Sequence, residues 1–534
     1  MSNYVCLRHD NVAAWKDFTR NAVKLLDLYR HLLETYVLDF FTRDLWSKLN
    51  PSWQEVLDTI TSSNLADFLS QDKSFSQQKV WPLSLLAFRA SCNAYTLPRK
   101  PVTSAEPFTE YIRRQGFAQE VSETVDNETT SERNCQINSE DSNSIDSTGL
   151  TGSSHPLQQI TVNWGTADNE LSAAAGQHKL LQHVFRRHLK PKKQHEVARL
   201  SLVAGYVART TCDGVMVDVG SGQGHLSRLL AYGHDVRVVC LEAQDEFIRG
   251  AKKFDNQLEL AAEKMKRRYA SLPELPPSPR HTVCHLEPDM SHEAFKEAVT
   301  GAWPELEGRG GVCGLLGLHT CGNLAPTMLR IFTNMPTCHA VVSVGCCYMK
   351  LDTVSDVTKD PGYPMSKAVQ TIAGNELSYE AREVACHAIE MYAERLHLGA
   401  DNLKVHCYRA ALEEIIVRYW PELSHAGLRS VNHAHEMEFP VYAKAAIARL
   451  NDVTLPEEDL TSERTNHNLS RWMQVVVFYS MRLLLAPVVE SVVLMDRLLY
   501  LYEKGVESIL VPAFDPQLSP RNHVLVAIKH KNIS

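Results

Sequence analysis

A short glycine-rich segment carries the clearest chemical signal in the sequence. It reads VDVGSGQGHL, and it follows an apolar, β-branched run and precedes an amphipathic helix. Gly220 permits a tight turn, Gly222 lets the backbone approach a ligand, and Gly224 lets the start of the helix pack on the strand. The spacing predicts a loop that binds a nucleotide-like cofactor, the alternative being an ordinary tight turn between a strand and a helix.

Two carboxylates indicate what this loop binds. Asp218 precedes the glycines, and Glu242 ends the next predicted strand, where it could accept hydrogen bonds from both ribose hydroxyls. A carboxylate beside a helix N-terminus would repel a pyrophosphate but attract a cationic amino-acid end. The pair therefore favours S-adenosyl-L-methionine, which carries an ammonium and a sulfonium group.

A second group of reactive side chains follows the fourth and fifth predicted strands. His319 and Cys321 come directly after one strand, and Cys346 and Cys347 come after the next. Both sets are expected at the carboxyl edge of the sheet, beside the cofactor. A neutral imidazole at His319 could take a proton from a hydroxyl or an amine.

The cysteines of this group admit three interpretations. Cysteines in these loops are typical of cytosine C5 methylation, but the proline that accompanies them in such enzymes is missing. His319, Cys321, Cys346 and Cys347 could hold zinc, but nothing in their spacing demands it, so no metal site is predicted. The third interpretation, favoured for Cys346, is a small buried side chain that packs the end of the sheet.

The elements that must position these residues alternate between strands and helices. Such alternation predicts an α/β fold with a mostly parallel sheet. The predicted strands are Val215–Val219, Val236–Leu241, Thr282–Leu286, Val312–Leu318 and Ala340–Val344. The predicted helices between them are Gly224–Tyr232, Asp245–Arg268, Ser291–Val299 and Ala325–Phe332.

The C-terminal end differs from this alternation. Val506–Val511 and His523–Ile528 are joined by a proline-rich turn without a helix, which predicts an antiparallel hairpin. A sheet with one reversed strand resembles the class I, Rossmann-like methyltransferase fold. In that family Glu287 or Asp289 would fall where the adenine is contacted. The mostly helical stretch at about 361–470 is interpreted as an insertion into the sheet domain, which is predicted to span 164–534.

Two further regions precede this domain. Residues 1–117 show helical spacing of apolar residues and are predicted to form a helical region, either a cap over the neighbouring domain or a substrate-recognition module. Residues 118–163 are rich in Ser, Thr, Asn and acidic residues and are predicted to be a disordered acidic linker. The basic run Arg186–Lys193 could hold phosphates or could be a solvated helix face.

Composition limits the class of protein. The chain has 534 residues, 44% of them hydrophobic, and a net charge of −8, which argues against a generally basic nucleic-acid coat. Thirteen scattered cysteines and an N-terminus without an apolar signal core indicate reduced thiols and a cytoplasmic or nuclear protein. Residues 472–502 are apolar, but charges and a proline interrupt them, so a buried helix is expected and a membrane span is not. The interrupting residues are Arg482, Pro487, Glu490, Asp496 and Arg497.

Five segments together resemble one family. VDVGSGQGHLSR, GLHTCGNLA, SVGCCYMKL, HCYRAALE and FDPQLSPRNHVLVA are similar to those of the methyltransferase-like protein 25 family, most closely its 25B branch, also called ribosomal RNA adenine dimethylase domain-containing. The His-x-Cys-Gly and Cys-Cys-Tyr pieces also resemble a transfer-RNA 2′-O-methyltransferase family. The resemblance implies a site in two parts. The cofactor residues would be Asp218, Gly220, Gly222, Gly224 and Glu242, and the methyl-transfer pocket would be lined by His319, Cys321, Cys347 and Tyr348.

The chain also departs from these families. Adenine dimethylases carry an N-[LI]-P-[YF] tetrad after the fourth strand, whereas this chain has His-Thr-Cys-Gly there, and the N-terminal zinc-finger ligands of the transfer-RNA family are absent. The resemblance therefore implies an S-adenosylmethionine-dependent methyltransferase whose acceptor is an RNA nucleotide or an RNA-associated protein. The alternative is a catalytically silent binding protein that keeps the fold and acts as an interaction module.

Overall fold

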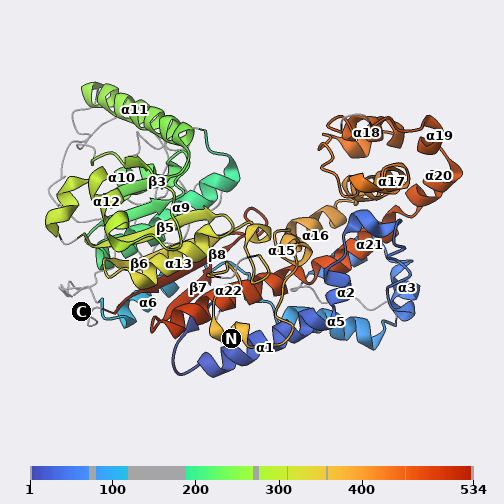
Figure 1. Ribbon diagram of the computed structural model, residues 1–534, viewed down its shortest axis with the longest axis horizontal. Helices are drawn as coiled ribbons and strands as arrows, with labels where there is room; N and C mark the ends of the chain where they lie inside the picture. The colour runs from blue at the N-terminus through green and yellow to red at the C-terminus, as the bar shows by residue number, and fades with distance from the viewer. Residues whose placement is uncertain are drawn as a thin grey trace, which may run out of the picture.

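The computed structural model describes residues 3–70, 80–117, 188–268, 276–309, 311–356, 359–450 and 453–530. The predicted acidic linker and the start of the basic run lie outside these ranges. The described chain forms a sheet with helices on both faces and, beside it, a region built of helices (Figure 1).

The sheet has eight strands in the order β1-β7-β8-β6-β5-β2-β3-β4. Strands β2 to β6 pair in parallel, β8 runs antiparallel to both β6 and β7, and β1 runs antiparallel to β7. This arrangement confirms the predicted class I sheet with its C-terminal antiparallel hairpin. The strand bounds are β1 Val5–Leu7, β2 Val215–Val219, β3 Arg237–Glu242, β4 Arg280–Val283, β5 Cys313–Thr320, β6 Cys338–Gly345, β7 Ser508–Pro512 and β8 His523–Ile528.

Two features of the sheet differ from the sequence prediction. Strand β1 lies inside the stretch predicted to be helical, because Val5 pairs with Leu510 at the far end of the chain. Strand β4, Arg280–Val283, begins two residues before the predicted run Thr282–Leu286 and ends inside it. It pairs only with β3 at the sheet edge, and Leu286 is buried in the loop that follows rather than in the strand. Both differences arise from tertiary packing that a local apolar pattern does not record.

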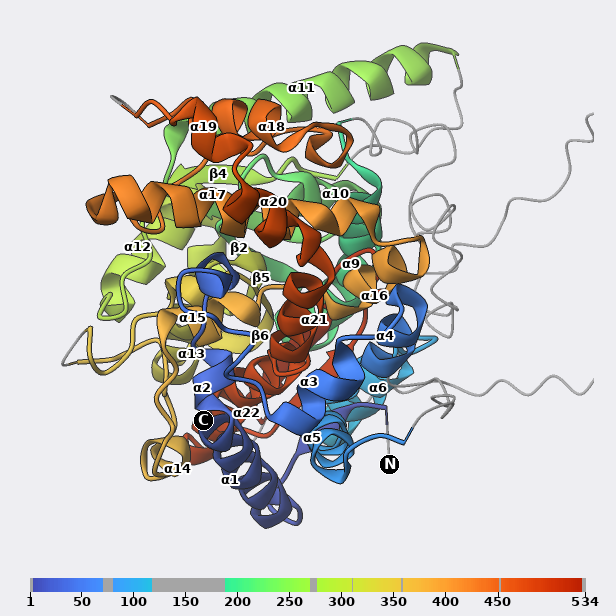
Figure 2. The same ribbon diagram turned by 90° about the vertical axis from the view of Figure 1, so that its right-hand side faces the viewer.

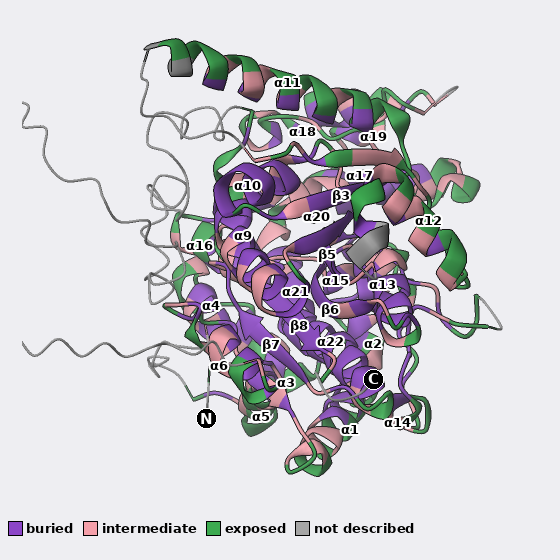
Figure 3. Cartoon of the chain, turned by 90° about the vertical axis from the view of Figure 1, so that its left-hand side faces the viewer, coloured by how far each residue is buried: buried purple, intermediate pink, exposed green. Residues whose placement is uncertain are grey.

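Alternate strand residues face two separate hydrophobic cores. In β2, Val215, Val217 and Val219 face one core and Met216 faces the other. Helices α6, α9, α10 and α11 pack on the second face, and α12, α13 and α22 pack on the first. Figure 3 shows the buried strands between these layers and the exposed outer side of α11. The bounds are α6 Glu106–Arg114, α9 Pro191–Thr211, α10 His225–His234, α11 Asp245–Arg268, α12 His292–Ala302, η4 Pro304–Arg309, α13 Leu324–Asn334 and α22 Ala486–Glu503.

The helical region joins segments from both ends of the chain. Figure 2 shows α1 to α5 below and α17 to α20 above, on the side away from the sheet. The N-terminal elements are α1 Val12–Leu28, α2 Arg30–Leu33, η1 Val37–Phe40, α3 Pro51–Leu57, α4 Ser62–Leu69 and α5 Leu83–Ala94. The elements between β6 and α22 are η5 Tyr348–Lys350, α14 Lys367–Gln370, α15 Tyr379–Val384, α16 Ile389–His397, η6 Asp401–Leu403, α17 Lys404–Tyr419, η7 Pro421–Leu423, η8 Ala434–Glu436, α18 Phe439–Ala446, α19 Glu457–Leu460, α20 Glu463–Ser470 and α21 Trp472–Leu483.

Helices α21 and α22 form the apolar stretch Trp472–Glu503. By length and composition alone this stretch could cross a membrane, but the window that meets the criterion is wholly buried inside the fold. Its charges have partners there: Glu490 accepts hydrogen bonds from Arg99 at 2.6 Å and from the Tyr348 hydroxyl at 2.9 Å. Asp496 accepts the backbone N–H groups of residues 365 and 366. The interior of the protein therefore supplies hydrogen-bond partners for these charged groups, which the hydrocarbon core of a bilayer would not.

Candidate active site at the carboxyl edge of the sheet

The glycine-rich loop after β2 has the backbone conformation that its residues predict. Gly220, Gly222 and Gly224 have φ angles of 67°, 55° and 68°, in the left-handed region that side chains rarely adopt. The Gly220 N–H donates to the Leu241 carbonyl at 2.8 Å, which ties the loop to the end of β3. A Cβ atom at Gly222 would meet nothing within 4 Å, so the loop leaves open space beside its backbone.

Glu242 lies at the end of β3 and holds this loop. Its Oε2 accepts the Gly222 N–H at 2.9 Å, and its Oε1 accepts the Gln244 N–H at 3.1 Å. The carboxylate is thereby fixed at the edge of the sheet while still lining a cavity. A polar ligand in that cavity would find this acceptor already oriented.

The cavity beside Glu242 has a volume of about 480 Å³. Gly220, Glu242 and Glu287 line it, as the sequence analysis expected, and Glu287 is exposed and lies 3.4 Å from His285 Nε2. Asp289, the other residue considered for the adenine contact, is not among its described lining residues. The full lining is Val219, Gly220, Leu241, Glu242, Ala243, Cys284, His285, Leu286, Glu287, Pro288, Cys321, Asn323, Leu324, Thr327 and Asp352.

Asp218 occupies a different position from Glu242. It is 3% exposed, accepts a hydrogen bond from the Ser227 hydroxyl, and is not among the described residues that line the cavity. Burial raises the pKa of Asp218 to about 6, although the hydrogen bond from Ser227 and the charge of Lys193 oppose that rise. The structure therefore places Asp218 beneath the loop, where it holds the start of α10.

His319 forms a pair with a buried carboxylate. Its Nε2 lies 2.8 Å from Oε2 of Glu196 on α9, and the other oxygen of Glu196 accepts the Ser519 hydroxyl at 2.6 Å. Burial opposes ionisation of Glu196, but the hydrogen bond and the charge of His319 hold its pKa below the usual value. The His319 backbone has a φ of 63°, and its side chain is 27% exposed. The imidazole is thus positioned by a carboxylate and remains accessible.

Three thiols converge beside the cavity. Cys321 Sγ lies 3.0 Å from Cys346 Sγ and 3.4 Å from Cys347 Sγ, and the latter two are 3.7 Å apart. Hydrogen bonds from Cys346 and Cys347 lower the pKa of Cys321 to about 6, although burial opposes the shift. Cys321 lines the cavity, and Cys346, which the sequence favoured as a packing residue, is indeed buried but contacts the other two.

Tyr348 belongs to the protein interior. Its side chain is 1% exposed and its hydroxyl donates to Glu490 at 2.9 Å. The guanidinium groups of Arg497 and Arg521 lie 5.7 and 6.0 Å from its ring centre. Of the four residues expected to line the methyl-transfer pocket, the structure brings His319, Cys321 and Cys347 to the accessible sheet edge and places Tyr348 below it.

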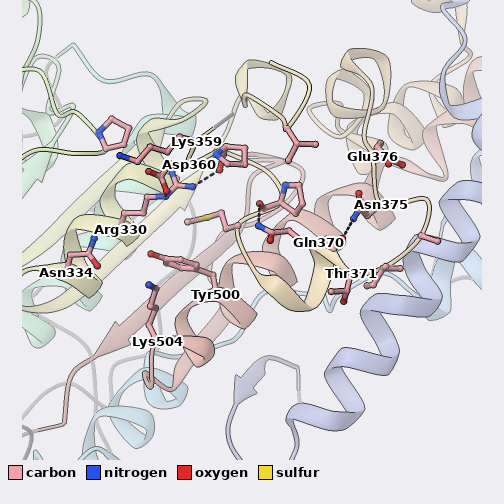
Figure 4. A pocket seen from close by; sticks show the side chains of 17 residues that line it. Arg330, Asn334, Lys359, Asp360, Gln370, Thr371, Asn375, Glu376, Tyr500 and Lys504 are labelled. Carbon is pink, nitrogen blue, oxygen red and sulfur yellow. Dashed lines mark hydrogen bonds and ion pairs between the residues drawn. The ribbon is translucent and has the colours of Figure 1, made fainter. Parts of the chain in front are cut away.

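A larger cavity of about 890 Å³ adjoins the first one, and Pro288 lines both. Figure 4 shows Arg330, Lys359 and Asp360 gathered on one side of it, with Tyr500 of α22 and Lys504, which directly follows that helix, below. Arg330 donates to the Pro361 carbonyl at 2.5 Å, so one end of its guanidinium group is already hydrogen-bonded within the protein. Gly220 of the glycine-rich loop and Cys321 of the three thiols line the smaller cavity, which is therefore the better candidate for chemistry.

Sequence reasoning missed Glu196 and Ser519 as parts of the site. Glu196 lies on the buried face of a helix that precedes the first strand of the motif, and Ser519 lies in the turn of the C-terminal hairpin. A buried acid within the apolar face of α9 was the one available signal. Its partner, His319, lies 123 residues further along the chain and could be identified only in the folded structure.

Comparison with known proteins identifies a methyltransferase domain in this part of the chain. A family described as a methyltransferase domain matches residues 192–354, which contain the loop, Glu242, His319 and the three thiols. The chain is 34% identical over 230 residues to a mouse protein named probable methyltransferase-like protein 25, and 32% identical over 230 residues to the human protein of that name. Each match covers 41% of this chain and 37% of the relative. No solved structure gives a significant match.

These comparisons support the resemblance at the level of methyltransferase-like protein 25, while assignment to its 25B branch stays a prediction. The matched region begins in α9 and extends past β6, so it contains both the glycine loop and the His319–Glu196 pair. Residues 192–354 of this chain therefore form a methyltransferase domain, and over 230 residues the chain is similar to proteins named probable methyltransferase-like protein 25.

Proposed function

We propose that the protein transfers a methyl group from S-adenosyl-L-methionine to an RNA nucleotide. The observation that carries the donor half is the cavity of about 480 Å³ bordered by Gly220 and lined by Glu242. The residues fit this cofactor: Glu242 is the acceptor for the ribose hydroxyls, Glu287 is available to the adenine, and the loop backbone leaves room at Gly222. Bound there, the cofactor would supply an electrophilic methyl group on its sulfonium.

The His319–Glu196 pair supports catalysis on the acceptor side. When a hydroxyl or an amine accepts a methyl group, it loses a proton, and a neutral imidazole is suited to receive it. Glu196, held ionised by its contact with His319, would orient the ring and stabilise the imidazolium that forms. His319 thus receives the proton and Glu196 is a positioning residue.

RNA is favoured as the acceptor by the first turn of α9. Lys190 and Lys192 are exposed there, and Lys192 Nζ lies 3.8 Å from Glu196. Burial raises the pKa of Asp218 and lowers that of His225, and the charge of Lys193 opposes the first shift and adds to the second. A basic turn next to the proposed proton acceptor would hold a phosphate backbone across the site.

A transfer assay with tritium-labelled cofactor tests this proposal. Purified protein is incubated with fractionated RNA and protein from cells that lack it, with the His319→Ala variant alongside. We expect nuclease-sensitive label with the wild type and little with the variant. Label that resists nuclease but not protease would make a protein the acceptor. Tight cofactor binding with no transfer to any fraction would favour the interaction-module alternative.

The basic turn can be tested separately from the chemistry. Replacing Lys190 and Lys192 together by Gln removes two positive charges from exposed positions, and Lys190→Gln alone leaves the 3.8 Å contact between Lys192 and Glu196 in place. We expect weaker RNA binding and a shallower dependence of affinity on salt, because each lost phosphate contact removes counterion release. Cofactor affinity should stay unchanged. An unaltered salt dependence would exclude this turn from the RNA-binding surface.

A further inference from the structure

We propose that Cys321, Cys346 and Cys347, here called the thiol cluster, bind a zinc ion at the edge of the donor cavity. All three sulfur atoms lie within 3.7 Å of one another. They come from two loops that follow adjacent strands, Cys321 after β5 and the other two after β6. This site goes beyond methyl transfer, because metal binding at it requires neither the cofactor nor an acceptor.

The separations of the sulfur atoms suit a zinc ion better than a disulfide. Tetrahedral zinc with Zn–S bonds of about 2.3 Å places its sulfur ligands about 3.8 Å apart. The observed separations of 3.0, 3.4 and 3.7 Å approach that arrangement, and small side-chain rotations would open the shortest one. A disulfide needs an S–S distance of about 2.05 Å and joins only two of the three thiols.

The backbone holds the two loops together before any ion binds. Gly322, with a φ of 55°, approaches Lys350 so closely that a Cβ atom would lie 2.6 Å from the Lys350 carbonyl oxygen. The β5–β6 pairing extends to Thr320 and Gly345, so the cysteines directly follow paired residues. Cys347 itself has a φ of 27°, a conformation rarely adopted by residues with side chains. The three ligands are therefore pre-positioned, which lowers the entropic cost of binding a metal.

The cluster has an access route and an open coordination position. Cys321 is exposed and Cys347 is half-buried, so an ion can enter from solvent. Within the described chain, no fourth His, Cys, Asp or Glu atom joins the group, and His319 is engaged with Glu196. Zinc sites with three protein ligands leave the fourth position to water or a substrate atom. By contrast, Cys313 and Cys338 are free cysteines that lie opposite each other in the β5–β6 register, near the other end of these strands, and both are buried.

Metal analysis of the full-length protein tests the proposal. The protein is purified with a thiol reductant, and its zinc is measured by inductively coupled plasma mass spectrometry before and after exposure to zinc and gel filtration. We expect one zinc ion per chain in the wild type, and its loss in Cys321→Ser, Cys346→Ser and Cys347→Ser. Cys284→Ser is the matched control, because Cys284 lines the same cavity outside the cluster and should keep the ion.

Cobalt substitution identifies the ligands directly. Replacing zinc with Co²⁺ should give an intense thiolate-to-metal charge-transfer absorption that each cluster variant weakens and Cys284→Ser preserves. Circular dichroism confirms that the variants remain folded. Glu242→Gln should lose cofactor affinity but retain zinc, so the two proposals can fail separately. Absence of zinc from the reduced, zinc-exposed wild type would overturn the proposal, as would zinc retained by all three cluster variants.

Discussion

The proposed donor side and the proposed acceptor side of the site are built in different ways. On the donor side, three glycines with left-handed φ angles and one carboxylate lie within the single strand–helix–strand unit β2–α10–β3, and Glu242 contacts the loop only 20 residues away. On the acceptor side, His319 meets Glu196 across 123 residues, and Glu196 meets Ser519 across 323. The donor side is local and made largely of backbone, whereas the acceptor side is assembled from side chains of distant segments.

Because of this difference, substitutions on the two sides should have different effects. A backbone cradle loses function when its conformation changes, while a side-chain pair loses function when either partner changes. If the comparison is right, substitutions on the acceptor side should reduce the rate and leave cofactor affinity intact, and those on the donor side should do the reverse. The four predictions below follow from that separation, in order of decreasing effect.

The largest effect is expected for His319→Ala. Loss of a general base typically slows a reaction about 10²–10⁴-fold, and the cofactor should bind as before because the imidazole acts on the acceptor. Single-turnover transfer and calorimetric titration of the cofactor measure the two effects. His285→Ala, which replaces a histidine that lines the cavity, is the control and should keep most of the rate. Equal rates for His319→Ala and wild type would make His319 structural.

Glu196→Gln should slow transfer roughly 10–100-fold, less than loss of the imidazole itself. The amide can still contact His319 but cannot stabilise the imidazolium with a negative charge. Ser519→Ala, which removes only a hydrogen bond to the other oxygen of Glu196, should have a smaller effect. The expected signature is a lower kcat with unchanged cofactor affinity. A parallel loss of cofactor binding in Glu196→Gln would mean that the two sides are not separable.

Glu242→Gln should weaken cofactor binding about 10–100-fold, the equivalent of about 1.5–3 kcal/mol for a charge-assisted hydrogen bond. Single-turnover rates at saturating cofactor should change little. Glu287→Gln serves as the comparison, and its effect should be smaller because Glu287 is exposed to solvent. The donor side would need redefinition if Glu287→Gln cost more affinity than Glu242→Gln.

Asp218 should affect stability more than binding. Its folded-state pKa of about 6 lies above the unfolded value of about 3.9, so between pH 4 and 6 the native state binds more protons and this group favours unfolding as pH rises. Asn at this position keeps an acceptor for Ser227 and removes the buried charge. Asp218→Asn should therefore raise the free energy of unfolding at pH 7 by roughly 1–3 kcal/mol, with no gain at pH 4.

Denaturant titrations at both pH values measure this change. Lys193, His281 and Glu242 also act on the Asp218 carboxyl, so Lys193→Gln provides a control that should raise its pKa further. A destabilised Asp218→Asn protein that also loses the cofactor would return Asp218 to the binding role that the sequence suggested.

The contrast between the two sides also explains how much the sequence predicted. The glycine loop, Glu242 and the sheet follow from local patterns, because strand alternation and left-handed glycines are written in consecutive residues. Glu196 and Ser519 could not be identified, since their role depends on segments that meet only after folding. Cys346 shows the limit within one motif: burial was predicted correctly, but its contact with Cys321 depends on the register between β5 and β6.

Strand β1 also has a consequence for the order of folding. Val5–Leu7 pairs with Ser508–Leu510, so this edge of the sheet is completed by a segment that is synthesised long after β1. At roughly 5–20 residues per second, the ribosome makes this partner about 25–100 s after β1 emerges. During that interval β1 cannot occupy its native place, and β7 and β8 are still missing from the sheet. The sheet can therefore close only after Ser508–Leu510 has been synthesised, which makes the nascent chain a candidate for chaperone protection.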